Sequence, residues 1–130
     1  MIRRGGTPVH LDTSFLIRAL DPSSREWATL RDLLKARRPL ALSTLAWGEF
    51  LCGPLEADDL PIARRLVRRH VPLGAAEAEY AARLFNASGR RRGSFGDCVI
   101  AATALLDGGA LATCDRDDFE RFVGEGLELV

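Results

Sequence analysis

The sequence lacks the features of a membrane-spanning, exported or disulfide-stabilised protein. Its longest apolar stretch is about nine residues, against the roughly twenty that a membrane-spanning helix needs. A secretion signal is not predicted either, because Pro8, His10 and Asp12 interrupt the apolar residues near the start. Three cysteines without a Cys-x-x-Cys pair predict reduced, buried thiols rather than a disulfide framework or a zinc site. We therefore expect a cytoplasmic protein with no membrane association.

Net charge and lysine are also scarce. The 18 basic and 18 acidic residues balance, which argues against a simple electrostatic clamp for nucleic acid. Of the basic residues 17 are arginine, and guanidinium groups match phosphate oxygens in paired hydrogen bonds. The arginines cluster at 3–4, 37–38, 64–65, 68–69 and 90–92. This pattern is compatible with a polyanionic partner but does not require one.

What the chain does contain is a regular alternation of short apolar runs and helical patterns. Strands are predicted at 8–12, 40–43, 71–74, 110–115 and 127–130. Helices are predicted at 23–38, 44–53, 57–70, 75–88, 94–106 and 117–122. Such alternation is typical of βαβ units, so we expect an α/β protein: a three-layer α/β/α fold with a central, mainly parallel sheet. A length of 130 residues predicts a single domain, with residues 1–7 as a flexible N-terminal tail.

Local signals support the helix boundaries. Ser23 and Glu26 have the spacing of a capping box, and Gly108-Gly109 would end the helix that contains Asp97. Ser94 and Asp97 fit the capping-box pattern as well. A cap is therefore one explanation for a carboxylate at the start of an otherwise apolar helix.

Carboxylates also stand where the predicted strands end. Asp12 follows one strand and Asp115 ends another, and in open parallel sheets the functional crevice lies beyond the carboxyl ends of the strands. Each has a structural alternative, since Asp12 can cap the next helix, and Asp115 and Asp118 can form a capping box or, together with Asp117, a solvated turn. A cap or a solvated turn does not readily explain Glu49, because its helical neighbours are uncharged and an inward-facing carboxylate needs a partner.

Several carboxylates in one crevice would repel each other, by about 4 kcal/mol for a pair 4 Å apart at an effective dielectric near 20. A divalent cation removes that repulsion, and oxygen ligands without His or Cys favour Mg²⁺ or Mn²⁺. Such a site supports attack of activated water on a phosphodiester. The residues thus indicate a metal-dependent nuclease.

Four motifs then occur in order: "VHLDTSFLI", "LSTLAWGEFLCG", "GDCVIAATAL" and "LATCDRDDF". Together they resemble the PIN-domain ribonucleases, and the short chain resembles the VapC-type toxins of type II toxin–antitoxin pairs. The resemblance implies a Mg²⁺- or Mn²⁺-dependent endoribonuclease that dimerises, cuts RNA and is inhibited by a cognate antitoxin protein. The acidic metal-binding and catalytic positions of the family fall on Asp12, Glu49, Asp97 and Asp115, with Asp118 as an additional acidic metal position and Thr13 and Thr113 as supporting hydroxyls.

Other candidates remain open. Arg90, Arg91 and Arg92 precede Asp97 closely and form either a phosphate grip for RNA or a solvated loop. The arginines at 64, 65, 68 and 69 are expected on a solvated or partner-binding face of the helix 57–70. His10, within a strand, and His70, at the end of that helix, have no catalytic pattern. The alternative function is a catalytically silent PIN-like module that binds RNA or a protein partner.

Overall fold

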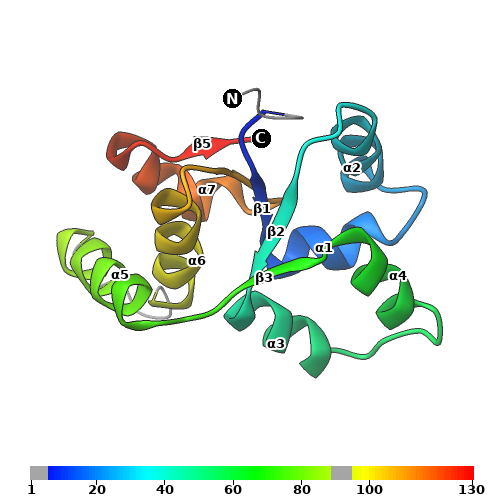
Figure 1. Cartoon of the computed structure of the whole chain (residues 1–130), viewed down its shortest axis with the longest axis horizontal. Coiled ribbons are helices and arrows are strands. Elements are labelled where there is room, and N and C mark those ends of the chain that lie inside the picture. The colour runs from blue at the N-terminus through cyan, green and yellow to red at the C-terminus, as the bar shows by residue number, and fades with distance from the viewer. Residues whose placement is uncertain (1–5, 89–94) are drawn as a thin grey trace.

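The computed structural model describes residues 6–88 and 95–130, which form a sheet between two layers of helices (Figure 1). The strands run in the order β3-β2-β1-β4-β5, and every pairing is parallel. The strands are β1 (Val9–Leu11), β2 (Leu40–Ser43), β3 (Arg69–Val71), β4 (Ala110–Ala112) and β5 (Glu128–Leu129). The predicted α/β/α class with a parallel sheet is confirmed.

Helices cover both faces of this sheet. Figure 1 shows α5, α6 and α7 on one side and α1, α2 and α4 on the other. The helices are α1 (Thr13–Ala19), α2 (Arg25–Lys35), α3 (Thr44–Cys52), α4 (Asp59–Leu66), α5 (Ala75–Ala87), α6 (Phe95–Leu106) and α7 (Arg116–Phe119), followed by the 3-10 helix η1 (Glu120–Glu125). In the described ranges, no helix has the length and apolar character to cross a membrane.

The core is centred on β1 and α6. All three residues of β1 are buried, and so is every residue of α6 from Cys98 to Ala104. Four of those seven α6 residues are alanine or cysteine, whose small side chains let the helix lie close to the sheet. Because α6 is buried along this length, the residue at its start is held at a fixed position relative to the sheet edge.

The Gly108-Gly109 end of α6 is confirmed, and both glycines have a steric reason. Gly108 has a φ of 66°, in the left-handed region that favours glycine. A Cβ on Gly109 would lie 2.7 Å from the carbonyl oxygen of Pro8. The chain therefore turns tightly from α6 into β4 beside the start of β1.

The predicted boundary between α4 and β3 is wrong. The helix ends at Leu66 rather than at 70, and the strand begins at Arg69, so His70 is a strand residue and not a helix end. Arg69 and His70 pair with Ala41 and Leu42 of β2, and the Arg69 guanidinium lies 2.5 Å from Asp107. These long-range contacts compensate for ending the helix early.

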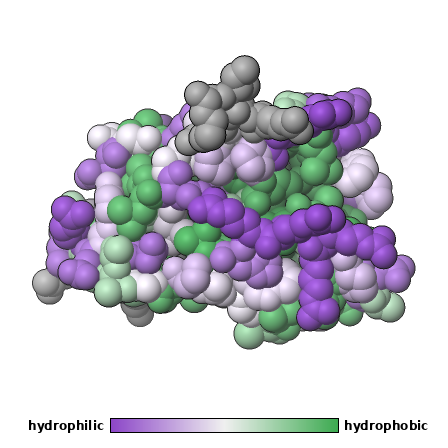
Figure 2. All heavy atoms as spheres, viewed as in Figure 1, coloured by the Kyte–Doolittle hydropathy of each residue, from purple (hydrophilic) through white to green (hydrophobic). Residues whose placement is uncertain are grey.

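The four arginines of this region consequently do not share one helix face. The residues 64, 65, 68 and 69 are all exposed, but only the first two belong to α4. Figure 2 shows a hydrophilic band across the region of β3 and α4 on the face presented there.

The expected capping box at Ser23 is also wrong, by one residue. Ser24 is the N-cap of α2, and its Oγ accepts a hydrogen bond from Trp27 N at 3.0 Å. Ser23 instead donates through both N and Oγ to Asp21, at 3.0 and 2.8 Å. Asp21 organises the turn before the helix and so moves the helix start to the next serine.

Two further expectations concern the cysteines and the N-terminal tail. The three cysteines all lie in the described ranges and form no disulfide there, but only Cys98 is buried, and Cys52 is exposed because Ala46 and Phe50 form the buried face of α3. Residues 1–5 of the expected tail lie outside the described residues. Thr7 accepts hydrogen bonds from Arg38 at 2.9 and 3.0 Å, which ties the chain down just before β1.

Candidate active site

Asp12 lies at the carboxyl end of β1 and is almost fully buried, with 3% of its surface exposed. Its Oδ1 accepts a hydrogen bond from Phe15 N at 2.7 Å, which makes it the N-cap of α1. Its Oδ2 accepts a hydrogen bond from the Thr113 hydroxyl. Burial nonetheless raises the pKa of this carboxyl above its usual range. The expected cap is confirmed, and the same carboxylate also lines the site described below.

Asp115 follows β4, beside β1 in the sheet, and so comes close to Asp12. Oγ of Ser14 lies 2.8 Å from Oδ2 of Asp115 and 3.2 Å from Oδ1 of Asp12. Thr113 Oγ1 accepts a hydrogen bond from Asp115 N at 2.9 Å. Asp115 makes no side-chain cap for α7, so the capping alternative for this residue is wrong.

Glu49 comes from the middle of α3 and completes the third side of the site. Thr13 Oγ1 donates a hydrogen bond to Glu49 Oε1 at 2.8 Å. Glu49 is exposed rather than inward-facing and dry, because α3 presents this side to the pocket and to solvent. The expectation that Glu49 faces inward is thus wrong, although its carboxylate does have a partner in the Thr13 hydroxyl.

Asp97 stands in the first turn of α6, and its side chain is 33% exposed. Its pKa is raised to about 6, first by desolvation and then by the charge of Asp118, with smaller contributions in the same direction from Asp12 and Asp115. The guanidinium of Arg121, 4.0 Å away, acts in the opposite direction. Ser94, its expected capping partner, lies outside the described residues.

One cavity of about 120 Å³ joins these side chains. It is lined by Asp12, Thr13, Ser14, Glu49, Asp97, Ile100, Asp115 and Phe119. We call Asp12, Glu49, Asp97 and Asp115 the pocket carboxylates. The structure therefore brings together four of the five acidic residues that the sequence singled out, from the ends of β1 and β4, from α3 and from α6.

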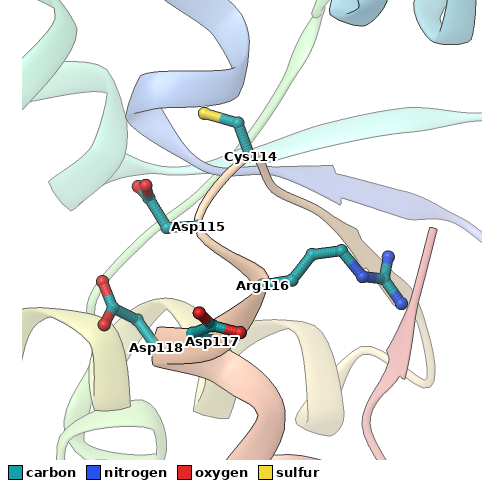
Figure 3. A pocket seen from close by; sticks show the side chains of 5 residues that line it. All are labelled: Cys114, Asp115, Arg116, Asp117 and Asp118. Atoms are coloured by element: carbon teal, nitrogen blue, oxygen red, sulfur yellow. The ribbon is translucent and has the colours of Figure 1, made fainter.

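Asp118 lines a neighbouring, larger cavity of about 370 Å³ instead. Figure 3 shows Asp115 and Asp118 on the same side of the segment that follows β4, while the Arg116 side chain points away from them. Because Asp118 raises the pKa of Asp97, it belongs electrostatically to the site although it does not line the first cavity.

The chemistry of these donors fits a hard divalent cation. All the polar side chains lining the smaller cavity offer oxygen, from carboxylates and hydroxyls. Desolvation is the largest cause of the raised pKa of Asp97, and repulsion from neighbouring carboxylates adds to it. Within the described ranges, no three His, Cys, Asp or Glu side chains already converge as a metal-ligand cluster. Separated carboxylates suit Mg²⁺ in particular, which retains several waters and uses few protein ligands.

Sequence reasoning missed two side chains of this site. Ser14 was not among the predicted site residues, although a serine at the start of the helix can reach both adjacent strand ends. No sequence pattern identifies Arg121 as a site residue, because its contact with Asp97 joins η1 to α6 and depends on the tertiary fold. Arg90, Arg91 and Arg92 lie outside the described residues, so their part in the site stays a prediction.

The raised pKa values predict the pH dependence of stability without metal. Between the unfolded pKa of 3.8 and the folded pKa of about 6 for Asp97, the folded protein binds more protons than the unfolded chain. The contribution of Asp97 to the free energy of unfolding therefore decreases as pH rises through this window. Asp12 acts in the same direction, whereas His10, whose pKa is lowered, acts in the opposite one. In chelator, Asp97→Asn will therefore raise Tm relative to the wild type more at pH 7 than at pH 5, whereas Asp32→Asn on α2 will show no such difference; an equal change in Tm at both pH values for Asp97→Asn contradicts the assignment.

A parallel sheet with a carboxylate-lined cavity beyond its strand ends defines the class of this protein, an α/β/α domain with an acidic site. The chain belongs to the PIN domain family, whose sequence model matches residues 9–125. No curated protein matches the sequence at a significant level.

Solved structures of toxin–antitoxin proteins share this fold. The VapBC2 complex of Rickettsia felis, bound to a promoter DNA fragment, aligns with a TM-score of 0.75 at 20% identity, over 95% of this chain and 97% of that one. A toxin–antitoxin complex from Klebsiella pneumoniae aligns with a TM-score of 0.69 at 25% identity, over 94% and 95%. VapC20 of Mycobacterium tuberculosis, a toxin that cleaves the sarcin–ricin loop, aligns with a TM-score of 0.64 at 21% identity, over 86% and 93%.

Proposed function

We propose that this PIN-domain protein is a metal-dependent endoribonuclease that acts as the toxin of a toxin–antitoxin pair. The observation that carries the proposal is the cavity lined by Asp12, Glu49, Asp97 and Asp115 at the carboxyl ends of β1 and β4. A catalytically silent binding module has no chemical need for four mutually repelling carboxylates. Membership of the PIN family supports the nuclease class.

In this proposal the pocket carboxylates hold Mg²⁺, for which Mn²⁺ can substitute. When bound, the cation makes water a better nucleophile and stabilises negative charge on the phosphodiester oxygens. The chain's own residues orient the ligands beforehand. Thr113 and the N–H of Phe15 fix both oxygens of Asp12, Ser14 reaches Asp115 and Thr13 holds Glu49.

The proposal also includes the substrate, the inhibitor and the assembly of the protein. We propose RNA as the substrate, a cognate antitoxin as the inhibitor and a homodimer as the assembly, with the whole chain forming one cytoplasmic domain. Support for an antitoxin comes from the similar structures, of which the Rickettsia felis and Klebsiella pneumoniae examples are toxin–antitoxin complexes.

Mapping of cleavage sites on total cellular RNA tests the enzymatic part. Purified protein with Mg²⁺ is compared with the Asp97→Asn variant prepared in the same way. Discrete cuts in the wild-type sample that are absent from the variant support the proposal. Binding of RNA without any cut by the wild-type protein would instead support the silent module.

The arginines at 90–92 provide a separate prediction about substrate binding. Replacing all three with alanine will weaken RNA binding and reduce its salt dependence, because each lost phosphate contact lowers the slope of log K against log[salt] by somewhat under one. The matched control replaces Arg64, Arg65 and Arg68, which are exposed, and removes the same charge elsewhere. If both triple variants show the same slope, residues 90–92 have no specific role in phosphate binding.

A further inference from the structure

Arg121 lies within ion-pair distance of one of the pocket carboxylates. Its Nη2 lies 4.0 Å from Oδ2 of Asp97, and within residues 6–88 and 95–130 no other cation forms an ion pair with a pocket carboxylate. The side chain comes from η1 and is only 17% exposed. A largely buried guanidinium that reaches the rim of an acidic cavity needs a structural or functional reason.

The surroundings of Arg121 fix its guanidinium on the side away from Asp97. Its Cζ lies 4.6 Å from the ring centroid of Phe122, a fully buried residue, which is the geometry of a cation–π contact. A cavity of about 160 Å³ borders the same side chain, and Glu125 lines it. Glu125 nevertheless forms no ion pair with Arg121 in the described part of the chain, so the guanidinium charge is directed to Asp97.

The hydrogen bonding of Arg121 is incomplete, which argues against a purely structural role. Its Nε is buried and has no hydrogen-bond partner among the described residues, and a buried unsatisfied donor is unfavourable. A methionine or leucine would fill the same space without that cost. The unsatisfied Nε of Arg121 therefore lowers the stability of the fold, and the attraction between its guanidinium and the Asp97 carboxylate offsets this loss.

We propose that Arg121 is a positioning residue for Asp97: it orients this carboxylate at the pocket rim and balances the repulsion from neighbouring carboxylates when no cation is bound. This inference rests on the proposed ribonuclease function, because the orientation of Asp97 matters to the reaction only if Asp97 serves it. Arg121 acts through Asp97 and does not contact RNA.

A double-mutant cycle on the metal-free protein tests the coupling without any measurement of activity. Arg121→Met keeps an unbranched side chain under Phe122 and removes the charge. In chelator, the factor by which Arg121→Met changes the unfolding equilibrium constant is measured in two backgrounds. This factor will be at least about threefold larger when residue 97 is Asp than when it is Asn. The matched control is Arg83→Met, because Arg83 stacks 4.8 Å from the Tyr80 ring but forms no ion pair with any described residue. Its effect will be the same in both backgrounds, and equal effects of Arg121→Met in both would overturn the proposal.

Cleavage kinetics test the consequence for the reaction. Arg121→Met will lower kcat by about 10- to 100-fold, the usual effect of removing a residue that orients a ligand, while KM for RNA stays unchanged. Arg121→Lys, which keeps the charge, will recover most of the loss. A raised KM with normal kcat would make Arg121 an RNA contact and overturn the positioning role.

The two proposals fail in different ways. If Asp97→Asn abolishes cleavage and Arg121→Met cuts RNA at the wild-type rate, the ribonuclease proposal stands and the role of Arg121 is wrong. If Asp97→Asn cuts RNA normally, the ribonuclease site itself is misplaced, whatever the cycle shows. A coupling of the expected size together with a kcat loss that lysine recovers supports both.

Discussion

Asp97→Asn, and separately Asp12→Asn, will abolish RNA cleavage in a protein that remains folded. Each substitution removes one negative charge from the set that would hold the cation, and we expect a loss of at least about 100-fold, the scale found when a charge-stabilising group is removed from an active site. Steady-state cleavage of a labelled RNA in Mg²⁺ measures this loss, and circular dichroism and melting curves measure folding.

The folded state should tolerate both changes. Asparagine is as good an N-cap as aspartate, so at position 12 it can still accept the hydrogen bond from Phe15 N. Ionisation of Asp12 and Asp97 is disfavoured in the folded protein, since the pKa of each is raised. A neutral amide therefore leaves the free energy of unfolding of the metal-free protein unchanged or increases it.

Asp117→Asn is the matched control. Asp117 is exposed and occupies the same segment as Asp115, but it does not line the cavity of the pocket carboxylates. This variant will cut RNA at the wild-type rate. Normal cleavage by both Asp12→Asn and Asp97→Asn would remove the basis for the nuclease proposal, and unfolding of both would show that these carboxylates serve only as caps.

The grouping of the acidic residues was predictable because it follows from strand direction. Asp12 and Asp115 come directly after strands, and neighbouring parallel strands end at one sheet edge. Asp97 stands at the start of a helix whose apolar sequence required burial, so its location was constrained as well. Glu49 was predicted to belong to the site, but its exposure was not, since helical periodicity cannot distinguish a face toward the core from one toward an open cavity.

The features that the sequence did not predict depend on contacts between distant segments. Arg69 belongs to β3 rather than to a longer α4 because it pairs with β2 and with Asp107, 38 residues away. Asp107 also lies 2.7 Å from the buried His10, whose pKa is lowered by desolvation. No local pattern near Arg69 or His10 indicates this network, and the same holds for the approach of Arg121 to Asp97.

The second large effect concerns the cation. Protein treated with chelator will lose cleavage, and Mg²⁺ or Mn²⁺ will restore it, because the pocket carboxylates repel one another and offer only oxygen ligands. Ca²⁺ will bind without efficient cleavage, since it holds oxygens at about 2.3–2.6 Å instead of the roughly 2.0–2.1 Å that Mg²⁺ demands. The measurement pairs RNA cleavage with melting curves after return of each ion.

Melting curves separate binding of the cation from its role in cleavage. A ligand that binds only the folded protein adds about 2.7 kcal/mol of stability at 100 times its Kd, which raises Tm by about 10 °C in a domain of this size. All three ions will produce such an increase, whereas only Mg²⁺ and Mn²⁺ will support cleavage. Asp12→Asn combined with Asp97→Asn will abolish the increase in Tm, and Asp117→Asn will retain it. If chelated protein cuts RNA at the wild-type rate, or if Mg²⁺ and Mn²⁺ change neither Tm nor cleavage, the pocket carboxylates do not share a catalytic metal ion.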